Sequence, residues 1–214
     1  NHFAYGQHGR WEILGARTVT ANLDGTFSLR DLLRGRFGTE WAMDHPSGDT
    51  LVLLDTDALA TLPLDAAAIG SPRGYRAISY GLDQDSDSTR SVSYAGVAFR
   101  PWSPASVSGD RDPATGDWTL NWVRRSRTDP EWRDNIDCAL GETSEAYEID
   151  VWDPSGGYLT IVRTIRTMHA TANYPAAEQT ADHGAPQTTL YLSIYQLSAL
   201  VGRGTPLTTS ITRI

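Results

Sequence analysis

The sequence contains no lysine, one cysteine and no uninterrupted apolar stretch of membrane-spanning length. All 18 basic residues are therefore arginine, a bias that we attribute mainly to a GC-rich coding genome. The single cysteine, Cys138, excludes an internal disulfide bond, so the fold must form in either redox compartment. The most apolar run, residues 51–70, is interrupted by Asp55, Asp57 and Asp65, which excludes a membrane-spanning helix.

Positive charge is also in deficit, because the net charge is −8 over 214 residues. Residues 1–103 hold nine arginines against twelve acidic residues, and residues 104–214 hold nine against fourteen. Neither half is basic, which argues against direct binding of nucleic acid. The hydrophobic content of 40% is that of a globular protein, so a core without a metal, disulfide or cofactor is expected.

The start of the chain carries neither an initiator methionine nor a signal peptide. We therefore interpret the sequence as a C-terminal piece of a longer protein.

Strand signals dominate, because short runs rich in Val, Ile, Thr, Tyr and Trp recur between Gly, Asp and Pro. Residues 11–23 and 26–29 flank Asp24-Gly25 and predict a hairpin. Residues 29–35 fit one helical turn that ends at Gly35. The segments 51–55, 75–81 and 91–101 predict further strands. The Pro-rich segment 101–117 predicts a boundary between a β-rich domain, residues 1–103, and a second domain, residues 104–214.

The second domain shows a regular alternation of apolar and polar residues. In WTLNW the side chains of Trp118, Leu120 and Trp122 fall on one face of a strand, as do Tyr147, Ile149 and Val151 in EAYEIDVW. The segments LTIVRTIRTM, NYPAAEQ, TLYLSIYQLS and LTTSITRI bring the total to six or seven strands, the number expected of a two-sheet sandwich. The pattern resembles that of fibronectin type III modules. We therefore predict an all-β protein, with an irregular N-terminal β domain followed by a fibronectin type III-like β-sandwich.

The segment LNWVRRSRTDPEWRD, residues 120–134, concentrates arginine and tryptophan. We expect Trp118 and Trp122 of the preceding strand in the core, and Arg124, Arg125 and Arg127 in ion pairs with nearby acids, among them Asp129, Glu131 and Asp134. A sugar-binding face is the alternative, in which Trp132 or Trp152 stacks on a sugar and arginine and carboxylate groups bind hydroxyls.

Candidate catalytic and metal-binding residues carry weak signals. The acids around Asp134 and Asp137 fit a solvated loop better than a glycosidase pair. DQDSDST lacks the glycine and the closing acid of a calcium loop and predicts a polar hairpin tip. His45 lies beside Asp44 and Asp49, but we interpret it as a turn histidine bonded to the backbone. His169 and His183 are isolated. No enzymatic activity is predicted.

Four segments carry a family resemblance: residues 9–55 with the run LLRGRFGTE, NWVRRSRTDPEWRD, GETSEAYEIDVWD and YQLSALVGRG. They resemble the C-terminal region of the large tail-tip proteins, called host-specificity, megatron or baseplate hub proteins, of gene transfer agents and siphophages. The resemblance implies a non-enzymatic, structural part of a particle tail that is assembled in the bacterial cytoplasm. It also implies other tail-tip and baseplate proteins as partners and a homotrimeric full-length protein. We expect the isolated fragment to be a monomer.

The alternative function is a carbohydrate-binding module that recognises surface polysaccharide, given seven Trp and nine Tyr in an acidic β-rich chain. Both versions allow contact with a glycan or receptor of the host surface. The expected contact residues flank the second and third sandwich strands: Trp132, Arg133, Trp152 and Tyr158. In the first domain, Trp41, together with His45 and Asp49, is expected in a second exposed turn.

Overall fold

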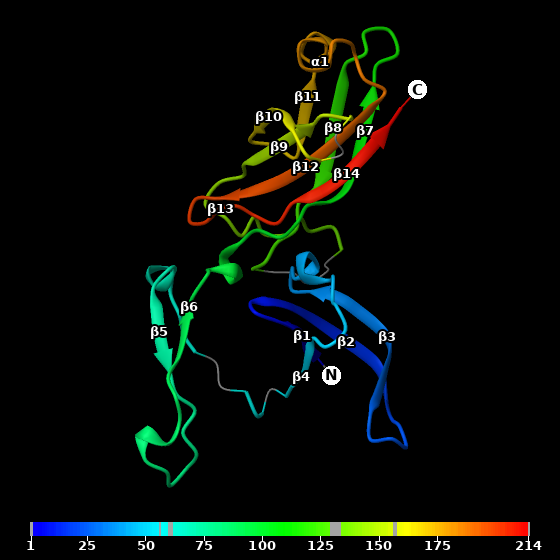
Figure 1. The fold of residues 1–214 in the computed structure, drawn as a ribbon. Helices are drawn as coiled ribbons and strands as arrows, with labels where there is room; N and C mark the ends of the chain where they lie inside the picture. The colour runs from blue at the N-terminus through cyan, green and yellow to red at the C-terminus, as the bar shows by residue number, and fades with distance from the viewer. Residues whose placement is uncertain (1, 56, 60–61, 129–133, 156–157, 214) are drawn as a thin grey trace.

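The structure is a computed structural model that describes residues 2–55, 57–59, 62–128, 134–155 and 158–213. Its N-terminal part contains a four-stranded antiparallel sheet in the order β3-β2-β1-β4 and a two-stranded sheet of β5 and β6. Short 3-10 helices connect these strands (Figure 1). The bounds are β1 His2–Gln7, β2 Arg10–Ala21, β3 Phe27–Arg36, η1 Glu40–Ala42, β4 Thr50–Leu54, η2 Ala66–Ala68, β5 Pro72–Tyr75, η3 Gln84–Ser86, β6 Arg90–Ser93 and η4 Val97–Phe99.

The C-terminal part is a sandwich of two antiparallel sheets. One sheet has the order β11-β8-β7, and the other has the order β10-β9-β12-β13, with β14 also paired to β12. The bounds are β7 Ala105–Arg111, β8 Trp118–Val123, β9 Tyr147–Trp152, β10 Ile161–Thr167, β11 Thr171–Tyr174, α1 Ala176–His183, β12 Thr189–Ser198, β13 Gly202–Arg203 and β14 Leu207–Thr212. This strand order confirms the predicted all-β fold with a fibronectin type III-like sandwich.

The core of the sandwich forms between its sheets, as the alternation in the sequence predicts. Trp118, Leu120 and Trp122 of β8 face Tyr147, Ile149 and Val151 of β9, and all six are buried. Leu190, Leu192 and Ile194 of β12 complete this layer. Complete burial of one large apolar side chain contributes roughly 1.5–3 kcal/mol, so this cluster is the main source of stability in the described chain.

Four predicted elements differ in the structure. The expected helical turn at residues 29–35 is part of β3, because pairs such as Leu29 with Val19 extend the ladder of the hairpin. Little of the expected strands at residues 75–81 and 91–101 forms, because β5 ends at Tyr75 and β6 ends at Ser93. The boundary segment 101–117 was expected to lack regular structure, yet Ala105–Arg111 forms β7, an edge strand of the sandwich. The division at residues 103 and 104 stays a prediction.

The segment NYPAAEQ was predicted as one strand, which is wrong beyond Tyr174. Pro175 cannot continue the ladder, and the helix-forming residues after it begin α1, which ends at Gly184 in the left-handed conformation. The buried Gln179 ties this helix to the sandwich, because its amide donates to the carbonyls of Gly116 and Tyr174 and its oxygen accepts from the Gln187 N–H.

Candidate functional site

The LLRGRFGTE run, which carries the family resemblance, ends β3 with an unusual backbone. Gly35, Phe37 and Gly38 all have positive φ, of 60°, 55° and 75°. Such a conformation is costly for a bulky residue such as Phe37 and persists only where the surroundings impose it. The turn presents the Phe37 ring to solvent at 55% exposure.

The same turn contacts the residues that lead into the sandwich. A Cβ added to Gly38 would lie 2.2 Å from Cδ1 of Trp102, so only glycine fits against this indole ring. Arg125, just after β8, is ion-paired with Glu40 of η1. Its guanidinium carbon also lies 5.1 Å from the centroid of the Trp102 ring, a cation–π contact. Trp102 is therefore held between two segments that are distant in sequence.

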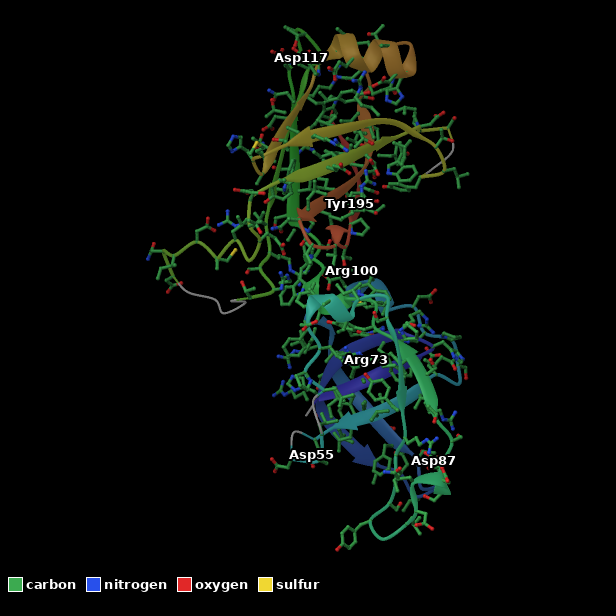
Figure 2. The ribbon with its side chains drawn as sticks, turned by 90° about the vertical axis from the view of Figure 1, so that its left-hand side faces the viewer. Asp55, Arg73, Asp87, Arg100, Asp117 and Tyr195 are labelled. Atoms are coloured by element: carbon green, nitrogen blue, oxygen red, sulfur yellow. The ribbon has the colours of Figure 1, made fainter. Side chains whose placement is uncertain are left out.

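A pocket of about 350 Å³ opens beside this contact. Its principal walls are aromatic and cationic, and they come from the β3 turn, from η4 and the segment after it, and from the segments after β8 and β13: Phe37, Trp41, Arg100, Trp102, Arg127 and Thr205. No carboxylate lines the pocket among the described residues. Figure 2 shows Arg100 at the level where the sandwich meets the N-terminal part.

The two arginines of the pocket differ in how they are used. Arg127 donates from Nε to Oε1 of Glu142 at 3.0 Å and from Nη2 to the carbonyl of Gly141. Arg100 is exposed, and its guanidinium has no hydrogen-bond or ion-pair partner within the described part of the chain. Its guanidinium fork is free to meet an anionic group of a ligand.

A buried ion network lies on the neighbouring sheet, and sequence reasoning missed it. Glu12 accepts hydrogen bonds from Arg34 and from the Gly35 N–H, and its Oε2 lies 2.9 Å from Nε2 of His45. Nδ1 of His45 lies 2.8 Å from Oδ2 of Asp49. Burial opposes ionisation of Glu12, but the hydrogen bonds from Arg34, Gly35 and His45 outweigh it and lower the pKa of this carboxyl.

Two expectations about His45 and Asp49 are wrong. Their side chains are buried, at 4% and 0% exposure, so they form no exposed turn with Trp41. His45 also bonds to side chains and not to the backbone. The cause is Glu12, which β2 brings to His45 from 33 positions earlier in the chain. Trp41 itself is 39% exposed, as expected, and lines the pocket.

Trp152 and Tyr158 lie together on the outer face of the β9 sheet. Trp152 donates from its indole N–H to Oγ of Ser193 at 3.0 Å. The ring of Tyr158 makes edge contacts with Trp152 and Tyr191, at centroid distances of 5.9 and 5.6 Å. Because these rings are tilted by 69° and 82°, the three do not form a flat stacking surface. Trp132 and Arg133 lie outside the described residues.

A second charged cluster shares that outer face. Arg203 of β13 donates to Glu148 and, through both terminal nitrogens, to the fully buried Asp150. Its guanidinium carbon lies 4.4 Å from the centroid of the Tyr195 ring. The hydrogen bonds with Asp150 are the main cause of the raised pKa of Arg203. Each of these charged groups has a protein partner, so the role of the cluster is structural: it links β13 to β9.

The arginines after β8 pair with acids, as predicted. Arg124 donates to Asp137 at 2.6 Å, Arg125 pairs with Glu40, and Arg127 pairs with Glu142. The expected partners Asp129 and Glu131 lie outside the described residues. Within the described ranges, no group of three or more His, Cys, Asp or Glu side chains is placed to hold a metal ion. None of the described helices has the length and apolar character needed to cross a membrane.

The strand order defines an all-β chain with a fibronectin type III-like sandwich. A family model described as "Rcc01698-like, C-terminal" matches residues 1–52. No curated protein matches the chain. Among solved structures, the crystal structure of the FN5 domain of Drosophila Lar is similar at 14% identity and a TM-score of 0.32, covering 52% of this chain and 95% of that one.

Proposed function

We propose that this chain is a non-enzymatic, structural module of a phage-like tail tip, of the kind that gene transfer agents carry. In this role its N-terminal sheet packs against other tail-tip or baseplate parts of the particle. The proposal also includes a homotrimeric full-length protein. The observation that carries the proposal is the low burial of apolar side chains in the N-terminal part.

Of the sixteen buried apolar residues that the structure describes, twelve belong to the sandwich core. The remaining four are the only buried apolar residues described in the N-terminal part: Phe3, Leu14, Ala42 and Ala68. Large apolar side chains on β2, β3, β4 and the turn between β2 and β3 stay exposed instead: Val19, Leu23, Phe27, Leu32, Leu33, Leu51, Val52 and Leu53.

These exposed side chains lie on both faces of the sheet. Leu53 pairs with Phe3 and shares its face, whereas Val52 points to the opposite face, and both are more than 40% exposed. β3 and β4 are also the two edge strands of the sheet. Soluble monomers rarely leave such edges and patches open, because they associate with other chains. A partner surface in an assembled particle would cover them.

Two further observations support the tail-tip assignment. The family-model match, residues 1–52, spans β1, β2 and β3 and reaches into β4, and it includes seven of the eight exposed apolar residues named above. The sequence of the β3 turn, LLRGRFGTE, is one of the segments that resemble tail-tip proteins. An interface made by a closed symmetric assembly would repeat this contact in each subunit.

Particle proteomics tests the proposal. We expect the full-length gene product to co-purify with particles in a constant ratio to other tail proteins. The double variant Leu33→Ser, Leu53→Ser should remain folded but fail to incorporate, because both side chains are more than half exposed in the described chain. The matched control is Thr18→Ser, an exposed position on β2. A wild-type product that is soluble and absent from particles would overturn the proposal.

A further inference from the structure

The pocket beside the β3 turn has no role in the structural function proposed above. Its aromatic walls come from segments that are far apart in sequence, and the turn holds Phe37 in a strained left-handed conformation. A volume of about 350 Å³ is within the roughly 300–1,000 Å³ of small-molecule sites. We propose that this pocket binds a carboxylated pyranose, such as a uronic acid unit of a surface polysaccharide.

Charge selects an anionic ligand. The chain has 26 acidic residues against 18 arginines, yet the pocket contains two arginines and no carboxylate among the described residues. Arg127 is neutralised by Glu142, whose side chain is 5% exposed. Of the two pocket arginines, Arg100 is the one whose guanidinium has no partner in the described chain. A planar carboxylate matches the guanidinium fork in two parallel hydrogen bonds, which a neutral hydroxyl cannot form.

Ring geometry selects a ligand with an apolar face. Trp102 is fixed between Gly38 and the guanidinium of Arg125, so it forms a rigid wall. Phe37 and Trp41 are 55% and 39% exposed and offer ring surface to a ligand. A pyranose has a flat C–H face and an equatorial rim of polar groups, which suits aromatic walls with a cation at the rim.

The polar rim of the pocket is small. Thr205 lies on it and contributes a hydroxyl that has no side-chain hydrogen-bond partner within the described chain. Thr39 is committed elsewhere, since its hydroxyl donates to the carbonyl of Arg36 and accepts from the Ile13 N–H. Arg100 and Thr205 are therefore the groups available for the carboxylate and one sugar hydroxyl. This inference does not depend on the tail-tip assignment.

The test compares an acidic oligosaccharide with its uncharged methyl ester. Titration calorimetry with the 214-residue chain uses a tri-galacturonate and the same oligosaccharide with every carboxylate methyl-esterified. We expect saturable binding of the acid and at least tenfold weaker binding of the ester. Arg100→Gln should weaken binding of the acid about ten- to a hundredfold, because a charge-assisted bidentate contact is lost. Trp41→Ala should weaken binding of both ligands.

The matched control is Arg73→Gln, because Arg73 is another exposed arginine without a partner in the described chain and lies outside the pocket. It should leave binding unchanged. Arg100 has no partner to lose, so its variant should keep the wild-type circular dichroism and melting temperature. Equal binding of acid and ester, equal effects of Arg100→Gln and Arg73→Gln, or no binding of the acid at millimolar concentration would each overturn the inference.

Discussion

Arg125 of the sandwich is ion-paired with Glu40 of the N-terminal part, 85 positions earlier in the chain, and it covers the ring of Trp102 at the same time. One side chain therefore connects η1 with the segment that leads into β7. Both partners are partly exposed, with side chains 33% and 25% accessible, so solvent screens the pair and its energy is modest. The close fit of Gly38 against Trp102 does more to fix this contact.

The first prediction concerns Gly38. Gly38→Ala should destabilise the chain by about 1–3 kcal/mol more than Gly48→Ala, because overpacking against Trp102 adds to the cost of positive φ. Gly48 has a φ of 97° and no atom within 4 Å of an added Cβ, so its variant reports the backbone cost alone. Urea unfolding followed by tryptophan fluorescence measures both. Equal losses would show that Trp102 does not restrict this turn.

The second prediction concerns pH and the Glu12 network. The pKa of Glu12 is lower in the folded chain than its ordinary value of 4.5, despite burial, because of hydrogen bonds from Arg34, Gly35 and His45. The ionised form therefore stabilises the fold fully above about pH 4.5. This contribution is lost as the pH falls through the lower, folded pKa.

Glu12→Gln checks the size and the sign of that effect. At pH 7 the free energy of unfolding of the variant should be about 1–3 kcal/mol lower than that of the wild type. This loss is smaller than that expected for a fully buried ion pair, because the Arg34 side chain is 35% exposed. The difference from wild type should shrink as the pH falls through the folded pKa of Glu12, because the carboxyl then becomes protonated in both states. Unfolding curves between pH 3 and 7 measure it. Asp57→Asn is the control, since Asp57 is exposed and its carboxylate has no hydrogen-bond or ion-pair partner in the described chain. A difference that grows on acidification contradicts the network.

The third prediction concerns Arg203 and Asp150. Arg203→Met should destabilise the sandwich by about 2–4 kcal/mol, because the fully buried Asp150 would lose both of its hydrogen bonds from Arg203 and keep only that of Thr164. Adding Asp150→Asn should recover a large part of this loss, because the unpaired charge of Asp150 is then removed while Glu148 keeps its ion pair with Arg166. A double-mutant cycle by thermal unfolding measures the coupling. Additive losses would mean that the two groups act independently.

Sequence periodicity predicted the sandwich well and the ion networks poorly. The alternation of Trp118, Leu120 and Trp122 is a local signal, and its burial follows from strand geometry alone. The pairing of His45 with Glu12 depends on how a turn folds back over a sheet, which no local pattern records. The pocket shows the same limit. Trp41 was singled out as an exposed residue, but Arg100 and Trp102 join it only through tertiary contacts.

The last prediction distinguishes the aromatic residues around Trp152 from those of the pocket by their effects on stability and on binding. Trp152→Ala should lower the melting temperature, because it removes the hydrogen bond to Ser193 and the ring contact with Tyr158, at a cost of about 2–3 kcal/mol for a half-buried ring. Its affinity for tri-galacturonate should stay at the wild-type value. Trp41→Ala should do the reverse and reduce binding with little loss of stability, because its ring is 39% exposed.

Trp132→Ala belongs in the same experiment, since Trp132 was expected to contact a glycan and lies outside the described residues. Calorimetric titration gives the affinity of each of the three variants for tri-galacturonate, and thermal unfolding gives its melting temperature. If Trp152→Ala or Trp132→Ala abolished binding at an unchanged melting temperature, the glycan contact would lie on the loops of the sandwich and not beside the β3 turn. Because stability and affinity are measured on the same samples, loss of fold and loss of the site cannot be confused.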